Sequence, residues 1–417
     1  MKTTALRLYG KNDIRLETFT LPPIQEGEIL CRIISDSICM SSYKAAIQGT
    51  AHKRVPADIA EKPIIIGHEF CGEIVQVGKR WQDQFREGQR FTIQPALNYK
   101  GSLAAPGYSY PYMGGAATMA ILSEEVMELG CLLPYAGESF FEGSLAEPMS
   151  CIIGAFHASY HTQNGVYTHQ MDIKQGGCCA ILAGAGPMGL GAIDYALHRE
   201  LRPSVLVVTD MDAARLNRAK ALFPVEEAAK QGVTLYYLDG RDDQALLSAT
   251  DGKGFDDVFA FAPVRAVVEQ ADRVLARDGC LNFFAGPSSA DFTASLNFYN
   301  VHYSATHIVG TSGGNIDDML ESLDMMAQKK LRPACMVTHV GGLAAAKEAT
   351  LTLPSIPGGK KLVYTHIDMP LTAIDDFEAL GKTDERFAKL HAYCKAHQML
   401  WNVEAERYVA KAFAREG

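Results

Sequence analysis

The glycine-rich turn GAGPMG at residues 184–189 constrains the fold of this chain more than any other feature. It follows the apolar run 179–183 and precedes an alanine- and leucine-rich segment that extends to about Arg199. Between a strand and a helix, such a turn binds a dinucleotide. Its first glycine permits the tight turn, its second admits the pyrophosphate, and its third lets helix and strand pack closely. We therefore assign cofactor binding to Gly184, Gly186, Pro187, Met188 and Gly189.

An acidic residue ends the next predicted strand, 205–210. Asp210 lies about 20 residues beyond the turn, where a carboxylate accepts hydrogen bonds from the adenosine ribose. Because it would repel a 2′-phosphate, Asp210 favours NAD(H) over NADP(H). Arg215, one turn into the following helix, could brace the same ribose and keeps NADP(H) as the alternative. Asp212 suits the N-cap of that helix.

The pattern of apolar segments changes near residue 150. Before it, short strand-like runs such as 28–34 and 72–78 are split by glycine and proline, which indicates a compact β-rich unit. After it, apolar strands alternate with helical patterns, which is typical of an α/β fold with a doubly wound parallel sheet. A chain of 417 residues is ample for two such domains. Further predicted elements are strands at 257–261, 280–284 and 306–310, a helix at 317–330 and a helical tail from about Asp368.

Four residues of the first part have the side chains of a metal site. Cys39 ends a predicted strand, His68 and Glu69 follow a glycine, and Glu147 precedes a proline. Cysteine, histidine and carboxylate together suit zinc, and three protein ligands leave one position for water or substrate. Such an open zinc polarises a carbonyl or lowers the pKa of a bound alcohol.

With the glycine-rich turn, these motifs make the chain resemble the zinc-containing medium-chain dehydrogenase/reductase family, its sorbitol and polyol dehydrogenase branch especially. Gly67-His68-Glu69 resembles the family's GHE motif and 145–148, LAEP, its EP motif. The resemblance implies a GroES-like, partly open β-barrel built from both chain ends. A Rossmann domain is inserted between them, and the active site lies in the cleft. We accordingly expect a catalytic domain at 1–152 and 314–367, a NAD(H)-binding Rossmann domain at 153–313, and a C-terminal helical extension at 368–417.

The same resemblance implies roles for individual residues. Cys39, His68 and Glu147 fall at zinc-site positions, and Glu69 either binds the metal or sits beside it. Glu69 is also assigned a catalytic role, in which it or Glu147 tunes the zinc-bound water. Ser41 matches the hydroxyl that contacts the reacting oxygen and starts the proton relay.

The chain also departs from the family pattern. An aspartate usual after the first ligand is Ser42 here, and Lys44 stands where some relatives have a relay residue. No cysteine occurs from 94 to 130. The sequence therefore predicts one catalytic zinc and no structural zinc.

Segments 310–319 and 108–115 and the long tail resemble the L-sorbose 1-phosphate reductases, which interconvert L-sorbose 1-phosphate and D-glucitol 6-phosphate. A phosphorylated substrate requires Lys or Arg donors, and the candidates are Lys44, His52, Lys53, Arg54 and Lys100. The predicted function is thus zinc- and NAD(H)-dependent interconversion of a keto-sugar phosphate and a polyol phosphate. Alternatives are a dehydrogenase of free polyols or threonine-like amino alcohols, and a non-enzymatic NADH-sensing protein.

The remaining expectations concern partners and location. A net charge of −9 disfavours nucleic acid. No apolar run approaches the roughly 20 residues of a membrane span, and the N-terminus lacks a signal-peptide pattern. We expect a cytoplasmic protein that binds a small sugar or sugar phosphate. The resemblance implies a homo-oligomer, either a dimer or a tetramer.

Overall fold

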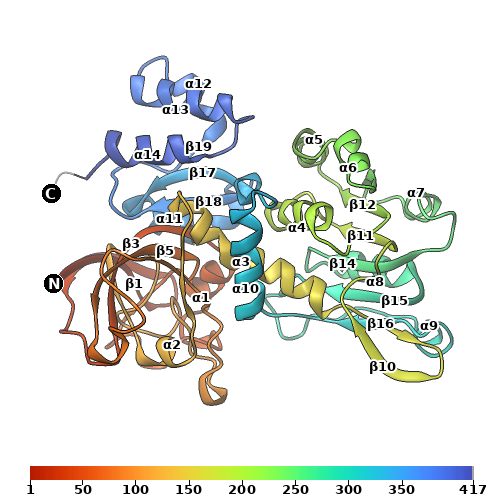
Figure 1. The fold of residues 1–417 in the computed structure, drawn as a ribbon, viewed down its shortest axis with the longest axis horizontal. Helices are drawn as coiled ribbons and strands as arrows, with labels where there is room; N and C mark the ends of the chain where they lie inside the picture. The colour runs from red at the N-terminus through yellow and green to blue at the C-terminus, as the bar shows by residue number, and fades with distance from the viewer. Residues whose placement is uncertain (416–417) are drawn as a thin grey trace. The chain divides into compact units, whose positions relative to one another are not determined.

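The computed structural model describes residues 1–415, which form two compact units (Figure 1). The first unit contains Met1–Glu147 and Val337–Gly417, and the second is Pro148–Met336. Their first boundary falls inside helix α3 (Phe140–Ala158), at Pro148. A proline has no N–H to donate to the carbonyl one turn earlier, so the helical hydrogen bonding is interrupted there.

The second boundary differs from the expected residue 314. Helix α10 (Ile316–Ala327) belongs to the second unit, not to the catalytic part. Its Asp318 explains the assignment, because this carboxylate lies 2.8 Å from Nδ1 of His157 on α3 and also caps α10. The C-terminal tail belongs to the first unit.

A mixed sheet dominates the first unit, and most of its neighbouring strands are antiparallel. Its central contact joins the two chain ends, because β18 pairs antiparallel with β3, with Lys361 opposite Ile38. A smaller sheet has the order β2-β1-β4. The strands of the large sheet, in order, are β19 (Thr372–Ala373), β17 (Val337–Gly342), β18 (Lys360–Tyr364), β3 (Ile29–Ile38), β5 (Phe70–Val77), β6 (Arg90–Ile93) and β8 (Leu132–Pro134), with β7 (Met119–Leu122) paired to β3. The small sheet contains β1 (Lys2–Gly10), β2 (Asp13–Thr20) and β4 (Ile64–Ile65).

Short helices close the first unit around an apolar core. Helix α1 (Met40–Gln48) packs against α11 (Ala346–Leu351), which comes from the other end of the chain. Helix α2 (Glu124–Glu128) follows β7. Strands and helices share one buried cluster that includes Leu6, Ile38, Ala45, Ile66, Ala349 and Val363. The β-rich unit expected from the first third of the sequence is therefore present.

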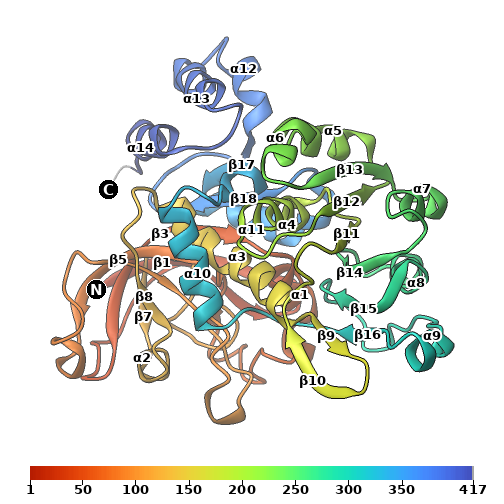
Figure 2. The same cartoon turned by 45° about the vertical axis from the view of Figure 1, so that its right-hand side comes forward.

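The second unit is a parallel sheet in the order β13-β12-β11-β14-β15-β16, which Figure 2 shows strand by strand. The order reverses direction between β11 and β14, which makes the carboxyl end of β11 a topological switch point. The predicted doubly wound α/β fold is confirmed. Its strands are β11 (Cys178–Leu182), β12 (Val205–Asp210), β13 (Thr234–Asp239), β14 (Phe255–Ala260), β15 (Leu275–Phe283) and β16 (His307–Val309). Its further helices are α4 (Pro187–His198), α5 (Ala213–Leu222), α6 (Val225–Lys230), α7 (Asp243–Ser248), α8 (Arg265–Arg273) and α9 (Phe298–Tyr303).

Two strand features were not predicted. Strand β13 lies at the sheet edge with several side chains exposed, so it lacks the continuous apolar run of its neighbours. A hairpin of β9 (Tyr160–Gln163) and β10 (Val166–Met171) precedes β11, and β10 is exposed throughout. The capping prediction is confirmed, because the Asp212 side chain accepts from the N–H groups of Ala214 and Arg215.

The predicted helical tail is confirmed as α12 (Phe377–Leu380), α13 (Glu385–Ala396) and α14 (Val403–Ala412). In Figure 1 these helices lie on the side of the first unit formed by β17 and β19. Buried Glu406 attaches α14 to the first turn of α3 by accepting from the N–H groups of Phe140 (2.7 Å) and Phe141 (2.8 Å). Tyr364 donates to the same carboxylate at 2.8 Å, and Trp401 donates to Tyr364 at 2.7 Å. Throughout residues 1–415, no helix is long and apolar enough to cross a membrane.

Candidate metal centre and nucleotide turn

Three of the four predicted metal-site residues form one donor group. The candidate ligand atoms of Cys39, His68 and Glu69 all lie within 4.8 Å of one another. Cys39 directly follows β3 and is the N-cap residue of α1, and the other two precede β5. Because β3 and β5 are paired antiparallel, with Asp36 opposite Phe70, the end of one strand lies beside the start of the other.

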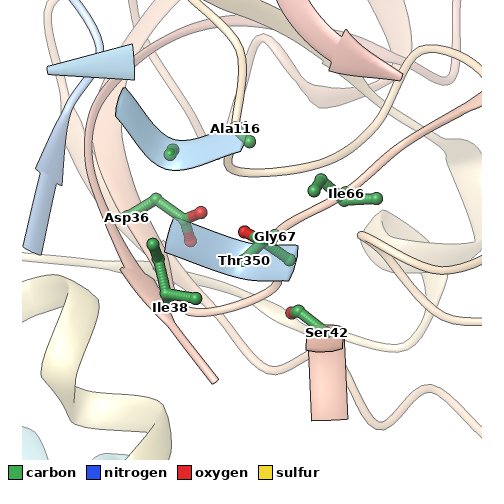
Figure 3. A pocket seen from close by; sticks show the side chains of 8 residues that line it. Asp36, Ile38, Ser42, Ile66, Gly67, Ala116 and Thr350 are labelled. Atoms are coloured by element: carbon green, nitrogen blue, oxygen red, sulfur yellow. The ribbon is translucent and has the colours of Figure 1, made fainter. Parts of the chain in front are cut away.

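Gly67 is required where it stands. Its φ of +91° lies in the left-handed region, and an added Cβ would meet the Asp36 carboxylate and lie 2.7 Å from the Ala116 nitrogen. Figure 3 shows Asp36 beside Gly67 on the wall of a small cavity of about 10 Å³, with Ser42 nearby. Burial, and then the charge of Glu69, raises the pKa of Asp36 well above its usual range, which favours a neutral carboxylic acid.

His68 is buried among hydroxyl groups. Its Nδ1 lies 3.3 Å from Ser42 Oγ, and its Nε2 lies 3.4 Å from Ser41 Oγ and 3.3 Å from the Tyr108 hydroxyl. Burial lowers the pKa of His68 to about 4, so the imidazole is neutral at neutral pH, as a metal ligand must be. Ser42, which stands where the family usually has an aspartate, is therefore the partner of the His68 Nδ1 atom.

Glu69 is held by a lysine from the other end of the chain. Lys360 Nζ donates to both carboxylate oxygens, at 2.6 Å to Oε2 and closer to Oε1, and Ser37 Oγ donates to Oε2. Burial lowers the pKa of Lys360, but the charges of Glu69 and Cys39 outweigh it and raise the pKa overall. Lys360 was not predicted. Its only sequence signal is a pair of lysines at the start of an otherwise apolar strand.

Glu147 lies near the group without joining it. It is buried on α3, close enough for its charge to act on Cys39, Tyr108 and Lys360. Burial, and then the charge of Glu69, are the main causes that raise the pKa of Cys39 to about 12; Glu147 acts in the same direction, and Lys360 acts against it. A cation beside the sulfur is what would convert this thiol to a thiolate ligand.

The donor set fits zinc. A sulfur, an imidazole nitrogen and a carboxylate oxygen are its usual ligands, at about 2.0–2.3 Å. Atoms that bind one zinc ion at those lengths lie closer to one another than 4.8 Å. Modest side-chain movements would therefore bring the three donors to one ion. Glu69 would share its oxygens between the metal and Lys360, and Glu147 is the other predicted carboxylate near the group.

Two hydroxyl groups lie beside the donors. Tyr108 donates a hydrogen bond of 2.7 Å to Ser41 Oγ, and Ser41 Oγ donates to Cys39 Sγ at 3.0 Å. The predicted Ser41 is therefore at the centre, whereas Tyr108 is a site residue that sequence reasoning noted only as part of a tyrosine- and glycine-rich segment. The ring of Tyr108 is also stacked on His52, with centroids 5.7 Å apart.

The glycine-rich turn has the geometry of a phosphate cradle. Gly186 is the N-cap of α4 and Pro187 its first residue. A Cβ added to Gly186 would meet nothing within 4 Å, whereas one on Gly189 would collide with the Gly184 carbonyl oxygen. The space at Gly186 fits a dinucleotide pyrophosphate, and Gly189 allows the close helix–strand packing that was predicted. Met188 lies in the same first turn of α4.

Glycine is required at position 184 by close packing and not by a left-handed backbone. The left-handed residue of the turn is Ala183, with φ +52°, rather than Gly184. Gly184 is instead required by packing, because its Cβ would lie 2.7 Å from the Ile181 carbonyl oxygen.

Asp210 lies at the turn, and Arg215 does not pair with it. Ala185 N donates to one oxygen of Asp210 at 3.2 Å, and Asp212 N donates to the other at 3.0 Å. Each carboxylate oxygen keeps further acceptor capacity for a ribose hydroxyl. Arg215 is half-exposed and pairs with Asp212 at 3.7 Å.

Comparison with known proteins finds a family match within each of the two units. Residues 25–135 match the family described as alcohol dehydrogenase GroES-like domain, and residues 187–328 match zinc-binding dehydrogenase. The L-sorbose 1-phosphate reductase of Klebsiella pneumoniae is 51% identical, over 98% of this chain and 97% of its own. The mannitol-1-phosphate 5-dehydrogenase of Aliivibrio fischeri is 52% identical, over 97% of each chain. The crystal structure of 2R,3R-butanediol dehydrogenase from Bacillus subtilis shares the fold, with a TM-score of 0.69, 20% identity, and coverage of 87% of this chain and 99% of that one.

Proposed function

The chain belongs to the zinc-containing medium-chain dehydrogenase/reductase family of alcohol and polyol oxidoreductases, and from that premise we propose that it interconverts a keto-sugar phosphate and a polyol phosphate. The specific reaction is reduction of L-sorbose 1-phosphate to D-glucitol 6-phosphate with NADH. The observation that carries this proposal is the group of partly buried Cys39 with buried His68 and Glu69, with the Ser41 hydroxyl beside it. Two relatives above 50% identity are named for phosphorylated sugars or polyols.

Cys39 and His68 would hold the zinc ion, with a carboxylate from Glu69 or Glu147, and residues 184–189 with Asp210 would hold the dinucleotide. When bound, the zinc supplies a Lewis acid for the substrate oxygen and the dihydronicotinamide supplies the hydride. NAD(H) is proposed over NADP(H) because the carboxylate of Asp210 lies directly at the turn.

Ser41 moves the proton in this proposal. Reduction of a ketone leaves its oxygen in need of one proton, and the Ser41 hydroxyl lies 3.0 Å from a candidate ligand atom. Ser41 delivers its proton to that oxygen and takes a replacement from Tyr108, which already donates to it at 2.7 Å. Solvent supplies the net proton. In the oxidative direction the same two hydroxyl groups carry the proton away from the alcohol.

Glu69 and Lys360 act as positioning residues. A buried carboxylate without a partner would be costly to keep ionised, and Lys360 provides that partner from β18. Lys360 thereby positions the Glu69 carboxylate beside Cys39 and His68. Because Lys360 is the first residue of β18, its ion pair also connects this strand to the metal centre.

A second candidate substrate comes from the relative of almost equal identity that is named mannitol-1-phosphate 5-dehydrogenase. L-Sorbose 1-phosphate carries its phosphate on the carbon next to the ketone. In mannitol 1-phosphate, carbon 5 lies far from the phosphate. The two candidates therefore differ in the distance between the phosphate and the reacting carbon.

The test is to follow NADH oxidation with L-sorbose 1-phosphate, fructose 6-phosphate and the two ketoses without phosphate, and to measure zinc per chain. We expect fast turnover with L-sorbose 1-phosphate alone. Fast turnover with fructose 6-phosphate instead would select the second candidate. Turnover with free ketoses alone would reassign the enzyme to free polyols, and NADH binding without zinc or turnover would support the NADH-sensing alternative.

A further inference from the structure

A basic cluster borders the candidate metal centre. It consists of Lys44 on α1 and of His52, Lys53 and Arg54 in the segment after η1 (Gly49–Ala51). Lys53 is exposed, and the other three are partly buried. With a net charge of −9, the chain as a whole is acidic, so this group of positive charges stands out against its background.

The cluster reaches the metal centre through the ring of Tyr108. The guanidinium carbon of Arg54 lies 5.5 Å from the ring centroid, and the ring of His68 lies 4.8 Å from the same centroid. The guanidinium of Arg54 and the imidazole of a candidate metal ligand are therefore both neighbours of one aromatic ring. His52 stacks on the same tyrosine with an interplanar angle of 10°.

The two outer cations have no counter-charge in the described part of the chain. Among residues 1–415, neither Lys53 nor the Arg54 guanidinium forms an ion pair or a side-chain hydrogen bond, and the packing of Arg54 on Tyr108 leaves its N–H groups available. The nearest acid along the chain, Asp58, pairs with Lys62 at 3.0 Å. Like charges brought together without compensation are typical of a site that binds an anion.

Partial burial reinforces this interpretation. Burial lowers the pKa of Lys44, and the neighbouring charge of Lys53 lowers it further, against the opposing effect of Cys39. Burial also lowers the pKa of His52, as do the charges of Arg54, Lys53 and Lys44. Electrostatic interactions therefore join all four groups, and a bound anion would offset the mutual repulsion of Lys44, Lys53 and Arg54 beside a neutral His52.

Hydrogen bonds hold the segment in place before any ligand arrives. Ser109 Oγ donates to the Arg54 carbonyl oxygen at 2.7 Å and accepts from Ala105 N at 3.0 Å. Arg54 N donates to His52 Nδ1 at 3.3 Å. Such preorganisation lowers the entropic cost of binding.

We propose that Arg54 and Lys53, flanked by Lys44 and His52, form the subsite that binds the phosphate monoester of the substrate. This inference rests on the proposed function, because it names the group that distinguishes a sugar phosphate from a free sugar. Arg54 can bind two phosphate oxygens with its planar fork, and Lys53 adds a point charge. Lys100 is not part of the subsite, because it lies over the Tyr99 ring in a neighbourhood that contains Glu125 and Glu128.

The experiment compares Arg54→Gln, Arg54→Lys and the double variant Lys53→Gln/Arg54→Gln with the wild-type enzyme, on L-sorbose 1-phosphate, fructose 6-phosphate and the free ketoses. Lys100→Gln is the matched control for the loss of one charge. Removing a charge-assisted hydrogen bond to phosphate should lower kcat/KM for the phosphorylated ketose about ten- to a hundredfold. The free ketose and the KM for NADH should be unaffected, and Arg54→Lys should recover part of the loss.

An equal loss on phosphorylated and free ketoses, or no loss on either, would overturn the subsite while leaving the proposed function in place. Should the wild type turn over no phosphorylated ketose, the proposed function fails, and inorganic phosphate becomes the probe. Calorimetric binding of phosphate to the wild type but not to Arg54→Gln would then support the subsite, and equal binding or none would overturn it. Thermal melts of each variant exclude misfolding as the cause.

Discussion

The nucleotide turn and the metal centre are built in opposite ways. The turn is one continuous segment of six residues, and each contact that shapes it joins residues close in sequence or on the adjacent strand. The centre assembles Cys39, His68 and Glu69 with Lys360, which lies 291 residues from its partner. The first can therefore be recognised as a motif, whereas the second depends on how two chain ends meet in one sheet.

The largest expected effect is at the centre itself. Cys39→Ser should reduce bound zinc from about one ion per chain to almost none and lower kcat/KM by about a thousandfold or more, since a Lewis acid contributes several kcal/mol. Elemental analysis and steady-state kinetics measure both. Cys178→Ser, in the second unit, is the control and should change neither quantity. Full activity without zinc in Cys39→Ser would refute the metal centre.

The next effect tests whether the distant lysine is essential to the centre. Lys360→Met leaves Glu69 buried without its partner, so we expect a loss of about 3–5 kcal/mol in the free energy of unfolding. The double variant Glu69→Gln/Lys360→Met should recover most of that stability without recovering activity. Denaturant unfolding of the wild type, both single variants and the double variant gives the coupling energy. Additive losses would show that the pair is not coupled.

Two glycine variants of the turn should change different quantities: one should weaken NADH binding, and the other should lower the stability. Gly186→Ala places a methyl group in open space, so the stability should change by less than about 0.5 kcal/mol while the Kd for NADH rises. Gly189→Ala forces its methyl group against the Gly184 carbonyl and should cost about 1–3 kcal/mol. Fluorescence titration with NADH and thermal melts distinguish the two variants. The opposite ranking would contradict the assignment of Gly186 to the pyrophosphate.

The smallest expected effect is on how the thermal stability of the second unit depends on pH. Hydrogen bonds that the protonated His157 donates to Asp318 and Glu321 raise its pKa to about 9 from the usual 6.5. A raised pKa contributes stability that is fully present below pH 6.5 and is lost as the pH rises through 9. The Tm advantage of the wild type over His157→Gln should therefore be largest near pH 6 and shrink by pH 9.5. A gap that does not depend on pH would show that the ion pairs contribute nothing.

Sequence patterns were sufficient wherever structure depends on neighbours in the chain. Strand β12 (Val205–Asp210) and the Asp212 cap appear as predicted because apolar periodicity and capping act within one segment. The left-handed backbone of the turn falls at Ala183, a residue that the sequence pattern did not single out. The sequence prediction ended the Rossmann domain too early, at residue 313. The hydrogen bond between Asp318 on α10 and His157 on α3 joins residues far apart in sequence, so no local pattern indicated it.

Residue types and spacing predicted the parallel dinucleotide fold, the turn at 184–189, and a metal site of Cys39, His68 and Glu147 with Glu69 as a ligand or a neighbour. Sterics and hydrogen bonds within a few residues determine the first two, and a motif resemblance provided the third. The ion pair of Glu69 with Lys360, the bond of Tyr108 to Ser41 and the cap that Glu406 places on α3 had no such signal. The first contact forms only when β18 pairs with β3, the second when the 105–115 loop packs on α1, and the third when the C-terminal tail packs on the first unit. Long-range burial, rather than local propensity, selects these partners.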